Sequence, residues 1–128
     1  MKKIVLFIVV SILMTSLAFA ETKVSRIALT TGIENKEPVD TITQTGTNFT
    51  TVYCFTEIQT NEYPTEVTHI WIHDKSIEAE VKLNIGSPKW RTHSSKIIVP
   101  EKSGDWKVEV YANNGKLIDS IEFTANGN

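Results

Sequence analysis

The sequence of 128 residues predicts an all-β protein, on the strength of three observations. After the first 20 residues, no segment carries the i, i+3, i+4, i+7 apolar spacing of a helix over ten or more positions. Short runs rich in Val, Ile, Thr and aromatic residues recur instead, separated by turn residues. Seven such runs in about a hundred residues favour one immunoglobulin-like or fibronectin-like β-sandwich of about seven antiparallel strands.

The expected strands cover residues 24–30, 49–59, 67–73, 77–85, 92–99, 106–111 and 117–124. In 77–85, apolar residues alternate with polar ones, so one face is predicted to be buried and the other wet. The inward residues of that strand are Ile77, Ala79, Val81, Leu83 and Ile85. Further on, Trp106, Val108 and Val110 are expected inward, and Asn114-Gly115 supplies the positive φ angles of a tight hairpin.

Two segments have less regular patterns. In 49–59, Tyr53 and Phe55 fall on one face while Val52, Cys54 and Ile58 fall on the other, so the register of that strand is left open. Residues 31–47 contain glycine and proline among polar residues and are interpreted as a long connection across one end of the sandwich.

The N-terminus has the pattern of a signal peptide. Lys2 and Lys3 precede an apolar run at 4–17, and Ala18-Phe19-Ala20 fits the small-x-small cleavage motif. The run is too short for a bilayer-spanning helix, and no Cys follows it for lipid attachment. We therefore expect a signal peptide at 1–20, a single domain at 21–128, no membrane anchor after cleavage, and a periplasmic or secreted location.

Charge and cysteine content exclude some classes. The 13 basic side chains less Lys2 and Lys3, against 15 acidic ones, give a formal charge of −4, which argues against a nucleic-acid surface. Cys54 is the single cysteine, so no internal disulfide forms. A buried residue within a strand is the expected role of Cys54, and an intermolecular bridge is the weaker alternative.

His69, Trp71 and His73 share one face of a predicted strand. Residues four apart on a strand lie roughly 13 Å from each other, too far for two ligands of one metal ion. A zinc site would need His93 or carboxylates from other strands, and no spacing predicts that. No metal or cofactor is therefore expected, and Trp71 is placed in the core with the histidines near the strand ends.

The segment 90–96 is the most unusual in the chain and supplies the main candidate site. In one interpretation Trp90 stacks on a flat ligand while Arg91 and Lys96 hold an anionic or hydroxylated group. In the other, Arg91 pairs with a carboxylate and Trp90 covers the sandwich edge. Strand alternation cannot place both Ile97 and Ile98 inward without a bulge, expected at Ser94-Ser95. The hypothetical ligand-binding set is Trp90, Arg91, Thr92, Ser94, Ser95, Lys96, His69 and Trp71.

Catalytic motifs are missing from the sequence. There is no Gly-x-Ser-x-Gly elbow and no Ser-x-x-Lys, and the carboxylates are scattered singly. A non-enzyme is therefore predicted.

Five motifs resemble a known bacterial family. They are Thr30-Thr31-Gly32-Ile33-Glu34-Asn35-Lys36-Glu37-Pro38, Cys54-Phe55-Thr56-Glu57, His69-Ile70-Trp71, the segment from Trp90 to Lys96, and Gly104-Asp105-Trp106-Lys107-Val108. In this order they resemble the family called domain of unknown function 2914. The resemblance implies a small exported or membrane-tethered β domain with no established activity. The lack of an added anchor or helical region in this chain suggests a free-standing periplasmic or secreted version.

Together these features predict an exported, non-enzymatic binding or protein-interaction module of the cell envelope. The expected partner is an envelope protein or glycan, and neither its identity nor the oligomeric state follows from the sequence. The alternative is a hydrolase of cell-envelope polymer that uses His69, His93 and a nearby carboxylate or hydroxyl. Convergence of those groups in a cleft would favour the hydrolase.

Overall fold

The computed structural model describes residues 21–127, and the signal peptide expected at 1–20 lies outside that part. The described chain is all-β, as predicted. Its strands are β1 (Thr22–Thr30), β2 (Ile33–Glu34), β3 (Glu37–Pro38), β4 (Gln44–Gly46), β5 (Thr50–Thr60), β6 (Thr65–His73), β7 (Ser76–Ile85), β8 (Lys89–Ile98), β9 (Gly104–Ala112) and β10 (Leu117–Asn126), with one 3-10 turn, η1 (Pro100–Lys102). All seven predicted strands are present, each within three residues of its expected ends. No helix in this part is long and apolar enough to cross a membrane.

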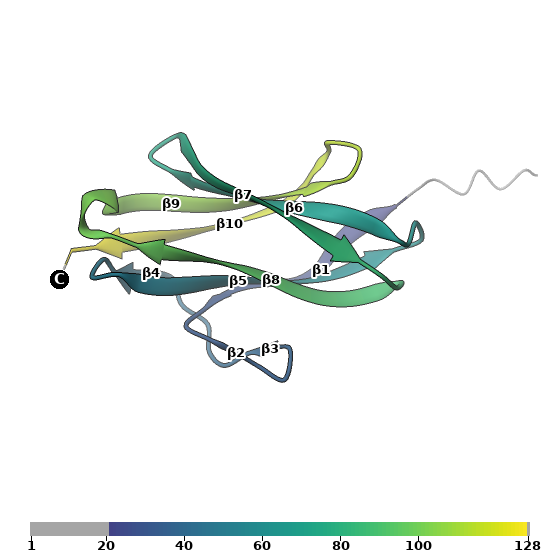
Figure 1. Cartoon of the computed structure of the whole chain (residues 1–128), viewed down its shortest axis with the longest axis horizontal. Coiled ribbons are helices and arrows are strands. Elements are labelled where there is room, and N and C mark those ends of the chain that lie inside the picture. Colours follow the sequence, from purple (N-terminus) through teal and green to yellow (C-terminus); the bar gives the residue numbers. More distant parts are fainter. Residues whose placement is uncertain (1–20, 128) are drawn as a thin grey trace, which may run out of the picture.

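The strands form two layers, visible edge-on in Figure 1. One layer is the three-stranded sheet β1-β5-β8, and the other is the five-stranded sheet β4-β10-β9-β6-β7. The β2–β3 hairpin projects from the outer side of the three-stranded sheet (Figure 1). Strand pairing is antiparallel except between β4 and β10, which run parallel. The expectation of an antiparallel sandwich therefore fails at this one edge.

The core lies between the two sheets and is centred on aromatic residues. Trp71 and Trp106 are almost fully buried, and both rings contact Phe123, with ring centroids 6.2 Å and 5.8 Å apart. Val108 and Val110 of β9 point into the same core, as the alternation in this strand predicts. The indole Nε1 of Trp106 donates to the carbonyl of Lys102, so the buried polar group is satisfied.

The structure shows which side chains of β5 face the core, a point that the sequence left open. Val52, Cys54 and Ile58 are fully buried toward the core. Burial raises the pKa of the Cys54 thiol to about 12, so it stays protonated and unreactive at neutral pH. Phe55 is also buried but belongs to the opposite, outer face, where the guanidinium of Arg26 lies 4.9 Å from its ring centre.

Three local expectations are corrected by the structure. Ile77 is 66% exposed, because the register shift between Trp71 and Ile72 leaves Glu78 as an extra residue in β7 and reverses the alternation beyond it. In the β9–β10 hairpin only Gly115 has a positive φ (85°), so Asn114 does not share that conformation. Residues 31–47 contain the short strands β2, β3 and β4 in addition to connecting loops.

Candidate binding site on the three-stranded sheet

The unusual segment 90–96 forms the middle of β8, and strand geometry divides it between two faces. Pairing with β5 is unbroken from Lys89 to Ile98, so the bulge expected at Ser94-Ser95 is absent. Ser94 and Ile98 are buried toward the core, whereas Ile97 is exposed on the outer side. The eight residues proposed from the sequence therefore do not meet in one site.

On the inner face, Ser94 belongs to a buried hydrogen-bond network that joins the two sheets. Its Oγ lies 2.6 Å from Nδ1 of His69 and accepts a 3.0 Å hydrogen bond from Nε1 of Trp71. The other imidazole nitrogen, Nε2, lies 3.0 Å from Oγ1 of Thr56. The indole can only donate, so the hydroxyl of Ser94 is free to donate to Nδ1, and Nε2–H then donates to Thr56.

His69 is neutral in this environment. Burial lowers its pKa to about 4, with a smaller contribution from His93. His69 and Trp71 are both 0% exposed, so neither can contact a ligand at the surface. The expected core position of Trp71 is correct, whereas His69 lies inside the sandwich and not near a strand end.

Trp90 covers the edge of the sandwich at the β7–β8 turn. Its ring lies against Gly86 so closely that a Cβ on this glycine would meet ring carbons at 3.2 Å. The indole is 38% exposed. Thr92 and Lys96 follow on the same side of β8 as Trp90 and are half-buried. These positions match the edge-packing interpretation of Trp90 more closely than the stacking one.

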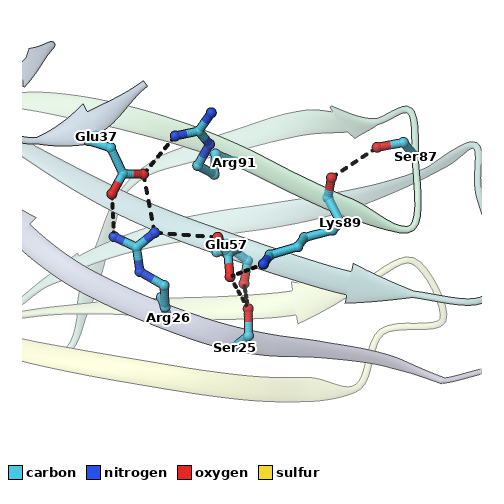
Figure 2. Close-up of polar contacts among 7 residues, drawn as sticks. All are labelled: Ser25, Arg26, Glu37, Glu57, Ser87, Lys89 and Arg91. Atoms are coloured by element: carbon cyan, nitrogen blue, oxygen red, sulfur yellow. Dashed lines mark hydrogen bonds and ion pairs between the residues drawn. The ribbon is translucent and has the colours of Figure 1, made fainter. Parts of the chain in front are cut away.

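The outer face of the sheet holds a cluster of ion pairs, drawn in Figure 2. The carboxylate of Glu37, from the β2–β3 hairpin, lies between Arg26 of β1 and Arg91 of β8. Arg26 donates to both of its oxygens, at 2.6 Å and 3.1 Å, and Nη1 of Arg91 donates to Oε2 at 2.9 Å. These hydrogen bonds lower the pKa of Glu37 to about 2. The expected pairing of Arg91 with a carboxylate is present.

Glu57 of β5 is the second carboxylate of the cluster, and its side chain is only 9% exposed. Ser25 donates to Oε1 at 2.9 Å, Arg26 donates to Oε2 at 3.3 Å, and the ammonium of Lys89 lies 3.9 Å from Oε1. The hydrogen bond from Ser25 is the main cause of a lowered pKa at Glu57, with Lys89 and Arg26 contributing. Arg26 therefore connects the two carboxylates.

The β2–β3 hairpin is held in place over the sheet, which fixes Glu37. Asn35 and Lys36 both have positive φ (51° and 63°), the geometry of a two-residue hairpin turn. At the base of the hairpin, Asp40 accepts three hydrogen bonds of 2.6–2.8 Å. The donors are the hydroxyl of Thr30, the hydroxyl of Thr31 and the backbone amide of Thr31. The carboxylate that pairs both arginines is thus presented by a tied-down loop.

Two neighbouring hollows lie on this outer face and share Arg91. The larger, about 420 Å³, is lined by Arg26, Glu37, Glu57, Lys89 and Arg91. The smaller, about 220 Å³, is lined by Lys36, Phe55, Trp90, Arg91, Thr92 and His93. Of the candidates from the sequence, Arg91 contributes to both hollows, and Trp90 and Thr92, whose side chains alternate to the other side of β8, border the smaller one. The remaining candidates line neither hollow: Ser94, Ser95, Lys96, His69 and Trp71.

The structure gives no support to a catalytic or metal-binding arrangement of the histidines. His69 faces the core, whereas His93 lies on the outer face, where its ring contacts Tyr53 with centroids 5.9 Å apart. The histidines required by the hydrolase alternative therefore do not converge. Within residues 21–127, no group of three or more His, Cys, Asp or Glu residues is placed to hold a metal ion.

Comparison with known proteins gives a family for part of the chain. The family described as "Protein of unknown function (DUF2914)" matches residues 64–125. The resemblance found in the motifs is confirmed over that stretch, whereas the motifs at 30–38 and 54–57 precede it.

Among solved structures, the chain is similar to a Niemann-Pick type C2 protein from Japanese carpenter ant, with a TM-score of 0.48 and 8% sequence identity, covering 87% of this chain and 96% of that chain. The search of curated proteins found no match.

Proposed function

We propose that the chain is an immunoglobulin-like or fibronectin-like sandwich that serves as an exported, non-enzymatic binding or protein-interaction module of the bacterial cell envelope. Its contact surface is the outer face of the three-stranded sheet beneath the β2–β3 hairpin. The partner is an envelope protein or glycan. The DUF2914 match is consistent with such a domain but assigns no activity.

The observation that carries the proposal is the arrangement around Arg91. Both arginines of the chain, from opposite edges of one sheet, meet at Glu37, which comes from a separate hairpin. Next to this contact are two hollows, and the larger, about 420 Å³, exceeds the lower limit of about 300 Å³ for small-ligand pockets. Charged groups held in place by neighbours before a ligand arrives lower the entropic cost of binding.

The test compares matched single-charge deletions on the two outer faces of the sandwich. The exported protein is purified, and mass spectrometry checks that its N-terminus is Glu21. The protein is then immobilised on a resin and incubated with envelope proteins in one arm and with envelope glycans in the other. Arg91→Ala removes a charge from the proposed surface, and Lys82→Ala removes one from the exposed side of β7.

We expect a component retained by the wild type and by Lys82→Ala but lost with Arg91→Ala. Equal retention by both variants would place binding elsewhere. Turnover of an envelope polymer by the purified protein would replace the proposal with the hydrolase alternative.

A further inference from the structure

The smaller hollow on the outer face differs from the larger one in charge. The larger hollow has carboxylates in its wall, from Glu37 and Glu57. The smaller hollow is bordered by Lys36, Arg91 and His93, together with Phe55 and the strand positions Trp90 and Thr92, and no carboxylate-bearing residue lines it. An anion placed there would meet Arg91 and Lys36, and the charge of the neighbouring Glu37 is offset by its two arginine partners.

Arg91 has donors to spare for such an anion. Its Nη1 donates to Glu37, and Figure 2 shows a dashed line from that nitrogen only. In the described part of the chain no further hydrogen bond of this guanidinium to the protein is found, although the group has five N–H donors. Glu37 therefore orients the guanidinium while leaving most of its N–H donors available to a second acceptor.

The local charge also favours an anion. The two hollows together are lined by four cations, at Arg26, Lys36, Lys89 and Arg91, and by two carboxylates. Both carboxylates are already paired with arginine. The whole chain has a formal charge of −2, so this surface is a positive region on an acidic protein.

Building on the proposed function, we infer that the smaller hollow binds an anionic group of the ligand, a carboxylate or a phosphate. Arg91 of β8 donates two parallel hydrogen bonds to it, because the planar guanidinium matches two oxygens of such a group. Lys36 contributes a second charge from the hairpin turn, and His93 contributes a ring N–H from β8. The ligand is thereby held between the hairpin and the sheet.

The experiment is an NMR titration of the ¹⁵N-labelled exported protein with inorganic phosphate and, in a second arm, with acetate, each at constant ionic strength set with sodium chloride. We expect saturable shifts confined to Lys36, Arg91, Thr92 and His93. Arg91→Ala and Lys36→Ala should each weaken binding about tenfold or more, as loss of a charge-assisted contact does. Lys82→Ala on the other sheet should leave the affinity within about twofold.

The phosphate and acetate arms identify which acid the site prefers, and Arg91→Lys, which keeps the charge but loses the fork, should bind more weakly than the wild type. Non-saturating shifts, or equal affinity in wild type and Arg91→Ala, would overturn the anion site. An envelope component lost with Arg91→Ala but not displaced by either anion would also overturn it, while the proposed function would stand. If the anions bind at Arg91 but no envelope component is retained, the anion site would stand and the proposed function would be overturned.

Discussion

The two faces of β8 use polar side chains in opposite ways. On the inner face, Ser94 satisfies the polar atoms of His69 and Trp71 in a core that excludes water. On the outer face, Arg91 and Glu37 form an ion pair with side chains 39% and 40% exposed. A buried polar group without its partner bears the whole desolvation cost, whereas an exposed one regains water. The inner face is therefore needed for stability, and the outer face is free to serve binding.

The largest effect expected from this comparison is that of Ser94→Ala. The change leaves Nδ1 of His69 and Nε1 of Trp71 without their partner inside the core, at about 1–3 kcal/mol for each group. We expect the free energy of unfolding to fall by about 2–6 kcal/mol. Chemical denaturation of the purified protein measures this difference.

Ser95→Ala is the matched control, since Ser95 is the next residue in β8 and is exposed. Its free energy of unfolding should stay within about 0.5 kcal/mol of the wild type. Similar decreases in the free energy of unfolding for Ser94→Ala and Ser95→Ala would show that the buried hydrogen bonds of Ser94 do not contribute more to stability than the exposed Ser95.

The second effect is a loss of stability in mild acid caused by His69. Its pKa is about 4 in the folded protein, against the ordinary value of 6.5 for a histidine in an unfolded chain. As the pH falls from 6.5 to 4, the unfolded chain takes up a proton that the folded protein does not, so stability decreases. The decrease approaches about 3 kcal/mol across this window. Denaturation curves at several pH values measure it, and NMR titration of the imidazole checks the folded pKa directly.

A His69→Gln variant separates this contribution from those of other groups. It carries no titrating group at position 69, so the slope between pH 6.5 and 4 should become shallower than that of the wild type. An unchanged slope would mean that His69 is protonated in the folded protein or that it is not buried in solution.

The strands were predictable because their signals are local. Trp106, Val108 and Val110 alternate with polar residues, and this pattern depends only on the period of a strand. Ile77 follows the same rule in the sequence, yet a bulge set by pairing with β6 turns it outward. A bulge depends on the partner strand, and nothing in the alternation of 77–85 marks it.

The candidate site was only partly predictable, because it is assembled from distant segments. Arg91 stood out through the rarity of arginine in the chain. Its partner Glu37 lies 54 positions away on a hairpin, and Glu57 belongs to a third strand. The turn residues Asn35-Lys36 between Glu34 and Glu37 were the available sign of that hairpin. No sequence pattern pairs these residues across the sheet.

The third expected effect separates the two arginines. Arg26 lies over the ring of Phe55 and pairs with the nearly buried Glu57, whereas Arg91 pairs only with Glu37 among the described residues. Arg26→Ala should therefore lower Tm more than Arg91→Ala does. Arg91→Ala should change Tm by less than about 3 °C, as exposed ion pairs usually do. Thermal melts of both variants in one buffer make the comparison, and a larger drop for Arg91→Ala would assign Arg91 to architecture.

The smallest effect expected is the contribution of Glu37 in strong acid. Its pKa is lowered from 4.5 to about 2, chiefly by its hydrogen bonds with Arg26 and then Arg91. A carboxylate with a depressed folded pKa stabilises the protein above pH 4.5, and that stabilisation is lost as the pH falls toward 2. Because the group is exposed, the wild type should melt only slightly above Glu37→Gln at pH 7, with the difference shrinking below pH 4.5. Both proteins retain His69, so its titration cancels from the difference in Tm. A difference that is unchanged between about pH 7 and pH 2 would show that Glu37 acts through shape and not through its charge, and the ion cluster would then no longer explain how Arg91 is oriented.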